Sequence, residues 1–188
     1  MNLALFGGTF DPIHNAHLSL ARLAAEQFHL HRVLFVPAFH PPHKAGITHA
    51  PYEDRVRMVE LACQGEPRFA VSRLEEGTVR SYSIDTIEAV RAGLRPRDEL
   101  FFLIGADAFA EICTWHRWQD VARGVRFLVA GRPGHRYTVP PGVRAEPMAG
   151  LELAVSSSEI RRSLAGGGNP PEVPPSVLEY TKSRGLYR

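Results

Sequence analysis

The chain has 188 residues, 44% of them hydrophobic, and a formal net charge of +2, which suits one compact domain over residues 1–188 with a buried core. The small charge and the scattered basic residues argue against a nucleic-acid partner, and no apolar run approaches the ~20 residues of a membrane span. Cys63 and Cys113 form no redox or metal motif and no export signal opens the sequence, so we expect a reduced, cytoplasmic protein that binds small anionic ligands.

Five short apolar runs are typical of strands buried on both faces of a sheet, because they are continuous rather than alternating. They lie at residues 3–6, 33–36, 69–71, 100–104 and 125–130. Segments with helical spacing of apolar residues separate them, at 15–28, 52–63, 83–92 and 115–123. The run LELAV (151–155) adds a candidate edge strand, and two helices are expected after it. This alternation predicts an α/β fold, a Rossmann-like doubly wound parallel sheet with C-terminal helices.

The first predicted strand runs into LFGGTFDPIHNAHL (5–18), which combines Gly7 and Gly8 with His14 and His17. A glycine pair at the end of a strand lets backbone approach a ligand, although a ligand-free turn fits it about equally well. The loop lacks the later glycine or lysine of the dinucleotide and phosphate-loop motifs. We expect Asn15 to cap the following helix, which places both imidazoles on one face near its positive end.

Two histidines on one face allow three interpretations. Zinc would need more ligands, and the nearest, His40 and His43, flank two prolines without a metalloprotease pattern. Buried structural histidines are the second interpretation. We favour the third, in which paired imidazoles and a helix N-terminus bind a phosphate whose charge grows during a reaction. His40, His43 and Cys113 are then structural or incidental.

The stretch AVSSSEIRR (154–162) offers related chemistry near the other end of the chain. Ser156 and Glu159 form a capping box, which by itself predicts only a well-capped helix. Ser157, Ser158 and Arg161 add hydroxyls and a guanidinium at the positive helix end. This combination suits a polyphosphate.

These two stretches resemble the signatures of the nucleotidylyltransferase superfamily. In the first, Thr9, His14 and His17 match the serine or threonine and the two histidines of a pattern that ends in H-x-G-H, and Ala16 replaces its glycine. The second is similar to I-S-S-T-x-I-R, with Val155 and Ser158 substituted. The resemblance implies that His14 and His17 are catalytic. It assigns the ATP contacts to Gly7, Gly8, Thr9, Phe10, Arg132, Ser156, Ser157, Ser158, Ile160 and Arg161.

Further segments resemble the bacterial nicotinate-nucleotide adenylyltransferase family, so the resemblance covers nearly the whole chain. They are PPHK (41–44), RSYSIDTI (80–87), LIGADAF (103–109), TWHRW (114–118), VAGRPG (129–134) and the C-terminal GLY. The resemblance implies a single nucleotidylyltransferase domain that joins ATP to nicotinate mononucleotide, releasing pyrophosphate and nicotinate adenine dinucleotide, with Mg²⁺ carried by ATP. It assigns the acceptor contacts to Lys44, Tyr82, Ser83, Gly105, Asp107, Trp115 and His116.

The residue types themselves agree with several of these assignments. Trp115 offers a flat face to a pyridine ring, whereas core packing is the better interpretation of Trp118. If Thr114 caps the predicted helix after it, the free N–H groups of the first turn can hold a nicotinate carboxylate. Asp107 is a ribose ligand, a helix cap or both, and Lys44 is either a phosphate contact or a solvated charge.

Other activities compete with this interpretation. The nearest is transfer to nicotinamide mononucleotide or pantetheine phosphate, or from a cytidylyl donor. A Rossmann oxidoreductase or nucleotide-binding module would place an acidic residue after the second strand, where VLFVPAFHPPHK (33–44) has none. A tRNA-synthetase-like module would need a tRNA-binding extension. We therefore expect small-molecule partners, without nucleic acid or membrane, and the sequence leaves a homo-oligomer open.

Overall fold

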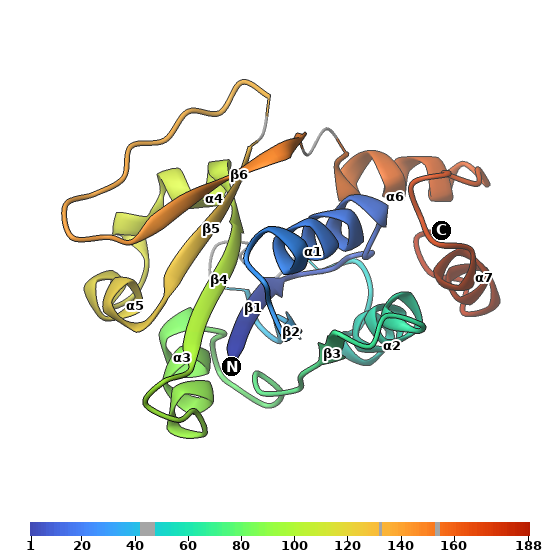
Figure 1. The fold of residues 1–188 in the computed structure, drawn as a ribbon. Helices are drawn as coiled ribbons and strands as arrows, with labels where there is room; N and C mark the ends of the chain where they lie inside the picture. Colours follow the sequence, from blue (N-terminus) through green and yellow to red (C-terminus); the bar gives the residue numbers. More distant parts are fainter. Residues whose placement is uncertain (42–47, 132, 153–154) are drawn as a thin grey trace.

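Strands and helices alternate along the chain as far as the fifth strand, as predicted, and the sixth strand is the next element (Figure 1). This computed structural model describes residues 1–41, 48–131, 133–152 and 155–188. The strands are β1 (Asn2–Gly8), β2 (Arg32–Pro37), β3 (Phe69–Val71), β4 (Glu99–Gly105), β5 (Arg126–Gly131) and β6 (Ala145–Glu152). The α-helices are α1 (Asn15–Gln27), α2 (Tyr52–Cys63), α3 (Ser83–Ala92), α4 (Ala106–Ala110), α5 (Trp118–Gly124), α6 (Ser157–Ala165) and α7 (Pro175–Ser183), and a 3₁₀-helix spans Ile112–Thr114.

All six strands are parallel and lie in the order β3-β2-β1-β4-β5-β6. The central strand β1 pairs with both β2 and β4, and Leu5 is in register with Leu34 on one side and Phe102 on the other. This order confirms the predicted doubly wound sheet. In such sheets, ligands bind beyond the carboxyl ends of the strands where the order reverses, which here is between β1 and β4.

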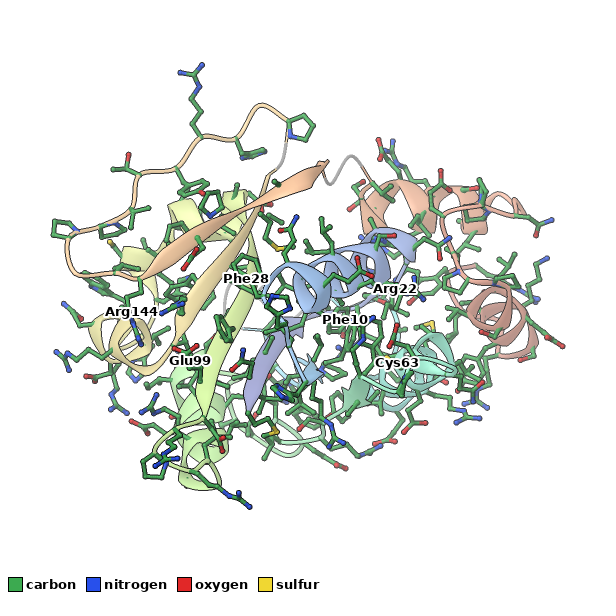
Figure 2. All side chains as sticks on the ribbon, viewed as in Figure 1. Phe10, Arg22, Phe28, Cys63, Glu99 and Arg144 are labelled. Carbon is green, nitrogen blue, oxygen red and sulfur yellow. The ribbon has the colours of Figure 1, made fainter. Side chains whose placement is uncertain are left out.

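The two faces of the sheet have separate hydrophobic cores. Ala4 and Phe6 of β1 join the core under α1, α2, α6 and α7, whereas Leu3 and Leu5 join the core under α3, α4 and α5. Arg22 of α1 extends over the Phe69 ring of β3, 5.9 Å from its centroid, on the α2 side of the molecule (Figure 2). Burial on both faces explains why the predicted strands are continuous apolar runs.

The start of α1 differs by one residue from the prediction. His14, not Asn15, is the N-cap, because its extended backbone (φ −146°, ψ 170°) directly precedes the first helical residue. Asn15 instead binds the segment before α7: its N–H donates to Glu172 O at 2.7 Å and its Nδ2 to Pro171 O at 3.1 Å. His14 therefore lies at the N-terminus of α1.

Two further boundaries were predicted wrongly. The edge strand expected at 151–155 is β6, which begins at Ala145. An edge strand is buried less evenly, so the mixed segment AEPMAGLE gives no continuous apolar run. The helix expected from Trp115 starts only at Trp118. Thr114 ends the 3₁₀-helix and donates its hydroxyl back to Glu111 O at 2.7 Å, so it caps no helix after it.

Within the described ranges, the structure has no helix that combines the length and the apolar character needed to cross a membrane.

Candidate active site

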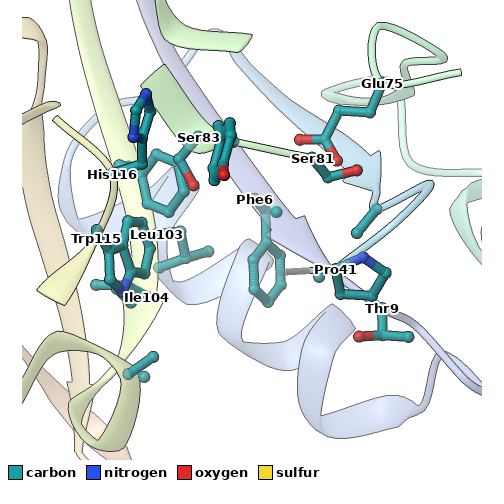
Figure 3. A pocket seen from close by; sticks show the side chains of 17 residues that line it. Phe6, Thr9, Pro41, Glu75, Ser81, Ser83, Leu103, Ile104, Trp115 and His116 are labelled. Carbon is teal, nitrogen blue, oxygen red and sulfur yellow. The ribbon is translucent and has the colours of Figure 1, made fainter. Parts of the chain in front are cut away.

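A cavity of about 310 Å³ opens at the carboxyl ends of β1, β2 and β4, where the strand order reverses (Figure 3). The fold therefore places a pocket where ligands of doubly wound sheets bind. Predicted site residues from three separate parts of the chain line it. They are Gly7, Gly8 and Thr9, then Tyr82 and Ser83, and finally Gly105, Trp115 and His116.

Aromatic rings form one side of this pocket. The rings of Tyr82 and His116 stack with centroids 4.3 Å apart, and Trp115 packs edge-on against Phe102 at 5.8 Å. These faces suit a flat, aromatic ligand. Trp118, for which core packing was predicted, packs against the core under α3, α4 and α5.

The N-terminus of α3 contributes positive charge to the same pocket. Ser83 is the first residue of α3 and Tyr82 is its N-cap, and both line the cavity. The first N–H groups of a helix have no acceptor within it and carry the positive end of its dipole. The sequence predicted such N–H groups on a helix capped by Thr114. Thr114 caps no helix, and the helix end that lines the pocket is that of α3.

Two polar residues of the pocket, Glu75 and Ser81, were not predicted. Glu75 is only 8% exposed; its Oε1 accepts the Thr86 hydroxyl at 2.9 Å, and its Oε2 has no hydrogen-bond partner among the described residues. Burial raises the pKa of this carboxyl, while the hydrogen bond from Thr86 acts against that rise. Ser81 Oγ accepts the backbone N–H groups of Phe39 and His40, at 2.9 and 3.0 Å. These bonds join the segment after β2 to the start of α3.

Gly105 and Asp107 mark the end of β4. A Cβ atom on residue 105 would lie 2.7 Å from Asp107 Oδ1, so glycine is required for the carboxylate to approach the strand end. The N-cap of α4 is Gly105, and Asp107 lies in the first turn, so the alternative in which Asp107 caps this helix is wrong. The ribose-binding role of Asp107 stays a prediction.

The two signature histidines stack on each other at the start of α1. Their ring centroids are 3.7 Å apart and the planes differ by 26°. The backbone N–H of His14 donates to His17 Nδ1 at 3.2 Å, so a neutral His17 carries its proton on Nε2. His14 is 4% exposed, and burial lowers its pKa to about 4. The free protein therefore holds His14 neutral at pH 7, and its buried Nδ1 has no hydrogen-bond partner among the described residues.

The Phe10 ring packs against the second histidine of this pair. This ring packs edge-on against His17 at 5.2 Å and against Phe6 at 5.5 Å, and it is only 2% exposed. A Cβ atom on Gly8 would come within 3.0 Å of this ring. Phe10, predicted as an ATP contact, is thus part of the core.

The second signature forms the capped helix that was predicted. Ser156 Oγ accepts the backbone N–H of Glu159 at 3.2 Å and donates to Glu159 Oε2 at 3.0 Å. Arg161 Nη2 donates to Ser158 Oγ at 3.1 Å. Ile160, predicted as an ATP contact, is 3% exposed and belongs to the core.

The start of α6 lies directly against the first signature loop. Arg161 Nη1 donates to the carbonyl of Asp11 at 2.8 Å, and Ser157 Oγ donates to the carbonyl of Pro12 at 3.5 Å. The two signatures, separated by most of the chain, therefore meet, as the sequence predicted. We call residues 11–17 together with residues 156–161 the phosphate wall.

Some predicted site residues cannot be placed in this geometry. Lys44 and Arg132, like His43, lie outside the described residues. Among the residues that are described, no group of three or more His, Cys, Asp or Glu side chains is arranged to hold a metal ion.

The strand order and a pocket at its reversal point are typical of nucleotide-binding α/β enzymes. In agreement, residues 5–163 match the cytidylyltransferase-like family, a class of nucleotidyltransferases.

Relatives that match over the whole chain identify the family within this class. The chain is 66% identical over 187 residues to a probable nicotinate-nucleotide adenylyltransferase of Solibacter usitatus, and 43% identical over 190 residues to one of Thermus thermophilus, with 100% of each chain covered. It therefore belongs to the nicotinate-nucleotide adenylyltransferase family. Its fold matches that of the Plasmodium falciparum nicotinic acid mononucleotide adenylyltransferase complexed with NaAD, with a TM-score of 0.76 and 18% identity over 99% of this chain and 97% of the other.

Proposed function

We propose that this site joins ATP to nicotinate mononucleotide, giving nicotinate adenine dinucleotide and pyrophosphate, as one step of NAD biosynthesis. The observation that carries the proposal is the adjacency of two subsites along one loop. Residues 7–9 line the aromatic pocket, and residues 11–17 continue into the phosphate wall. We take residues 1–188 to act as a single nucleotidyltransferase domain.

The aromatic pocket suits the acceptor. The pyridine ring would lie against Trp115 and near the stacked Tyr82 and His116 rings. The nicotinate carboxylate would lie at the N-terminus of α3 beside Ser83, where a helix end typically stabilises an anion by ~0.3–1 kcal/mol. Asp107 would accept a hydrogen bond from a ribose hydroxyl. This arrangement favours nicotinate over the uncharged nicotinamide.

The phosphate wall suits ATP. The 5′-phosphate oxygen of the acceptor would attack the α-phosphorus in line, forming one P–O bond while the bond from the α-phosphorus to the bridging oxygen breaks and pyrophosphate leaves. The imidazoles of His14 and His17 would donate to the α-phosphoryl group as its charge grows. Ser156, Ser157 and Arg161 would hold the leaving pyrophosphate at the start of α6. Such a reaction depends on positioning and charge stabilisation, without a covalent enzyme intermediate.

Adenylyl transfer from ATP generally uses a divalent metal ion, and we propose Mg²⁺ for this protein. Mg²⁺ keeps several waters and commonly binds through substrate phosphates plus one or two protein ligands, so it needs no dedicated protein cage. The serine hydroxyls of the phosphate wall would suit an ion that arrives with ATP, whereas its imidazoles would contact the phosphate itself. We also propose that the protein works in the cytoplasm, where the free Cys63 and Cys113 stay reduced.

The decisive experiment offers Mg-ATP to the purified protein with one acceptor at a time. The acceptors are nicotinate mononucleotide, nicotinamide mononucleotide and pantetheine phosphate, and the products are separated by chromatography. We expect nicotinate adenine dinucleotide and pyrophosphate in equal amounts. An ATP analogue with carbon in place of the α,β-bridging oxygen should give no product. Failure to form a dinucleotide from either pyridine nucleotide would overturn the proposal.

A further inference from the structure

The C-terminal Tyr187 reaches the first signature loop. Its hydroxyl donates to Asp11 Oδ1 at 2.7 Å, although 176 positions separate the two residues in sequence. Asp11 is 4% exposed, and its carboxylate also accepts the backbone N–H groups of His49 at 2.6 Å and Ala50 at 3.1 Å. Three donors on one buried carboxylate hold it in a single orientation.

Other distant groups hold the backbone of the same loop. Arg161 donates to the Asp11 carbonyl at 2.8 Å from the side of α6. From the side of α2, Arg55 donates to the Thr9 carbonyl at 2.7 Å and to the Ala38 carbonyl at 2.8 Å, and this arginine is 1% exposed. The segment that leads into His14 is therefore fixed by groups from several parts of the chain, and Tyr187 is the contribution of the C-terminal tail.

We propose that Tyr187 is a positioning residue for adenylyl transfer, because its bond to Asp11 orients the loop that carries His14 and His17. His14 stands three residues after Asp11, and its backbone N–H in turn fixes the ring of His17. Displacements of ~1 Å at a reacting centre can cost ~10²-fold in rate. The inference rests on the proposed function, since it assigns Tyr187 a part in that same reaction.

The state of Tyr187 agrees with this role. Burial and the neighbouring Asp11 carboxylate both raise the pKa of the phenol above its ordinary value. The hydroxyl therefore keeps its proton at neutral pH and remains the donor in the bond to Asp11. The phenol supplies no proton to the reaction and acts only through Asp11.

The chain contains a matched control for this bond. The hydroxyl of Tyr180 in α7 donates to Asp54 Oδ1, also at 2.7 Å, and Asp54 is 5% exposed. The distance and the burial of the carboxylate are alike in the two pairs, although Asp54 also accepts from Arg184 Nε at 3.1 Å. Asp54, however, lies in α2 and not in the signature loop. Tyr180→Phe therefore reports the structural cost of losing such a bond without disturbing the loop.

The test measures kcat, both KM values and the melting temperature for the wild type, Tyr187→Phe and Tyr180→Phe, assayed well below the lowest melting temperature. We expect Tyr187→Phe to lower kcat about tenfold with an unchanged KM for nicotinate mononucleotide. Tyr180→Phe should keep the wild-type kcat while losing comparable thermal stability. Equal kcat values in the two variants would overturn the inference.

A second measurement does not depend on turnover. In protein labelled with ¹⁵N-histidine, Tyr187→Phe should shift the imidazole resonances of His14 and His17, and Tyr180→Phe should leave them in place. Unmoved resonances in Tyr187→Phe would contradict the positioning role. A wild-type protein that makes no dinucleotide overturns the proposed function, whereas an active wild type with two equally fast variants overturns only the role of Tyr187.

Discussion

The two halves of the site are built by different physical means. The acceptor pocket is formed by packed rings, with Trp115 against Phe102 and Tyr82 against His116. The loop of the phosphate wall is held by hydrogen bonds to buried charges, chiefly Asp11 and Arg55. Packing defines a shape, which is enough to select a flat ring. Phosphoryl transfer needs donors in fixed directions, and only hydrogen bonds supply those directions.

Removing a donor from the phosphate wall should have the largest effect. We expect His17→Ala to lower kcat by ~10²–10³, because the lost Nε2–H would stabilise charge at the α-phosphoryl group. His14→Ala should behave similarly. Steady-state kinetics measure the effect, and His135→Ala, at an exposed position, serves as the control. A His17→Ala enzyme with nearly the wild-type rate would remove the pair from the mechanism.

The buried His14 should also make the phosphate wall sensitive to acid. Its pKa is about 4 in the folded protein, against an ordinary value of 6.5 for a solvated histidine, so the unfolded chain binds more protons between these values. The contribution of His14 is fully present above pH 6.5 and is lost as the pH falls toward 4. It amounts to about 3 kcal/mol of unfolding free energy.

Urea unfolding over this pH range, compared between the wild type and His14→Gln, isolates that contribution. The stability of the variant should depend less steeply on pH, because glutamine does not titrate. Parallel curves for the two proteins would show that His14 is accessible to protons in the folded state.

Substitutions in the acceptor pocket should raise KM for the acceptor and leave kcat unchanged. Stacking of a ring on an aromatic side chain is worth ~1–3 kcal/mol, so Trp115→Ala should raise KM for nicotinate mononucleotide about tenfold or more. KM for ATP should stay unchanged. Trp118→Ala is the comparison: it should lower the melting temperature and leave both KM values alone. If the two variants raise KM equally, Trp115 is only a packing residue.

The smallest effect concerns Ala16, in the first turn of α1 between the two histidines. Ala16→Gly restores the glycine of the signature pattern and should lower the unfolding free energy by ~0.5–1 kcal/mol, because glycine loses more backbone entropy in a helix. We expect kcat to stay the same. A higher kcat in the variant would show that the alanine methyl group crowds the triphosphate.

The sequence predicted the first five strands better than the sixth. The runs that became β1, β4 and β5 were recognisable because both of their faces are buried. The start of β6 was missed because this strand has no continuous apolar run, whereas the other edge strand, β3, was predicted at 69–71. The helix predicted from Trp115 is present but starts at Trp118. Its start was misplaced because the Thr114 hydroxyl bonds backward to Glu111, which apolar spacing does not reveal.

Within the site, residues with recognisable chemistry were found and those defined by burial were missed. His14, His17 and the Ser156 cap stood out through their spacing. Glu75 lies in the charged stretch LEEG, which gives no sign that its carboxyl is buried. Asp11 was visible in the signature, but its partner Tyr187 could be found only once the chain had folded.

The strand order also bears on how the protein forms during synthesis. The ribosome makes β1 first, yet β1 lies in the middle of the sheet, between β2 and β4. One edge of β1 can pair as soon as residues 32–37 emerge, whereas the other stays open until residues 99–105 have been made. Through that interval, apolar groups of β1 and an unpaired backbone edge are exposed to other chains. The nascent chain should therefore depend most on chaperones between its second and fourth strands.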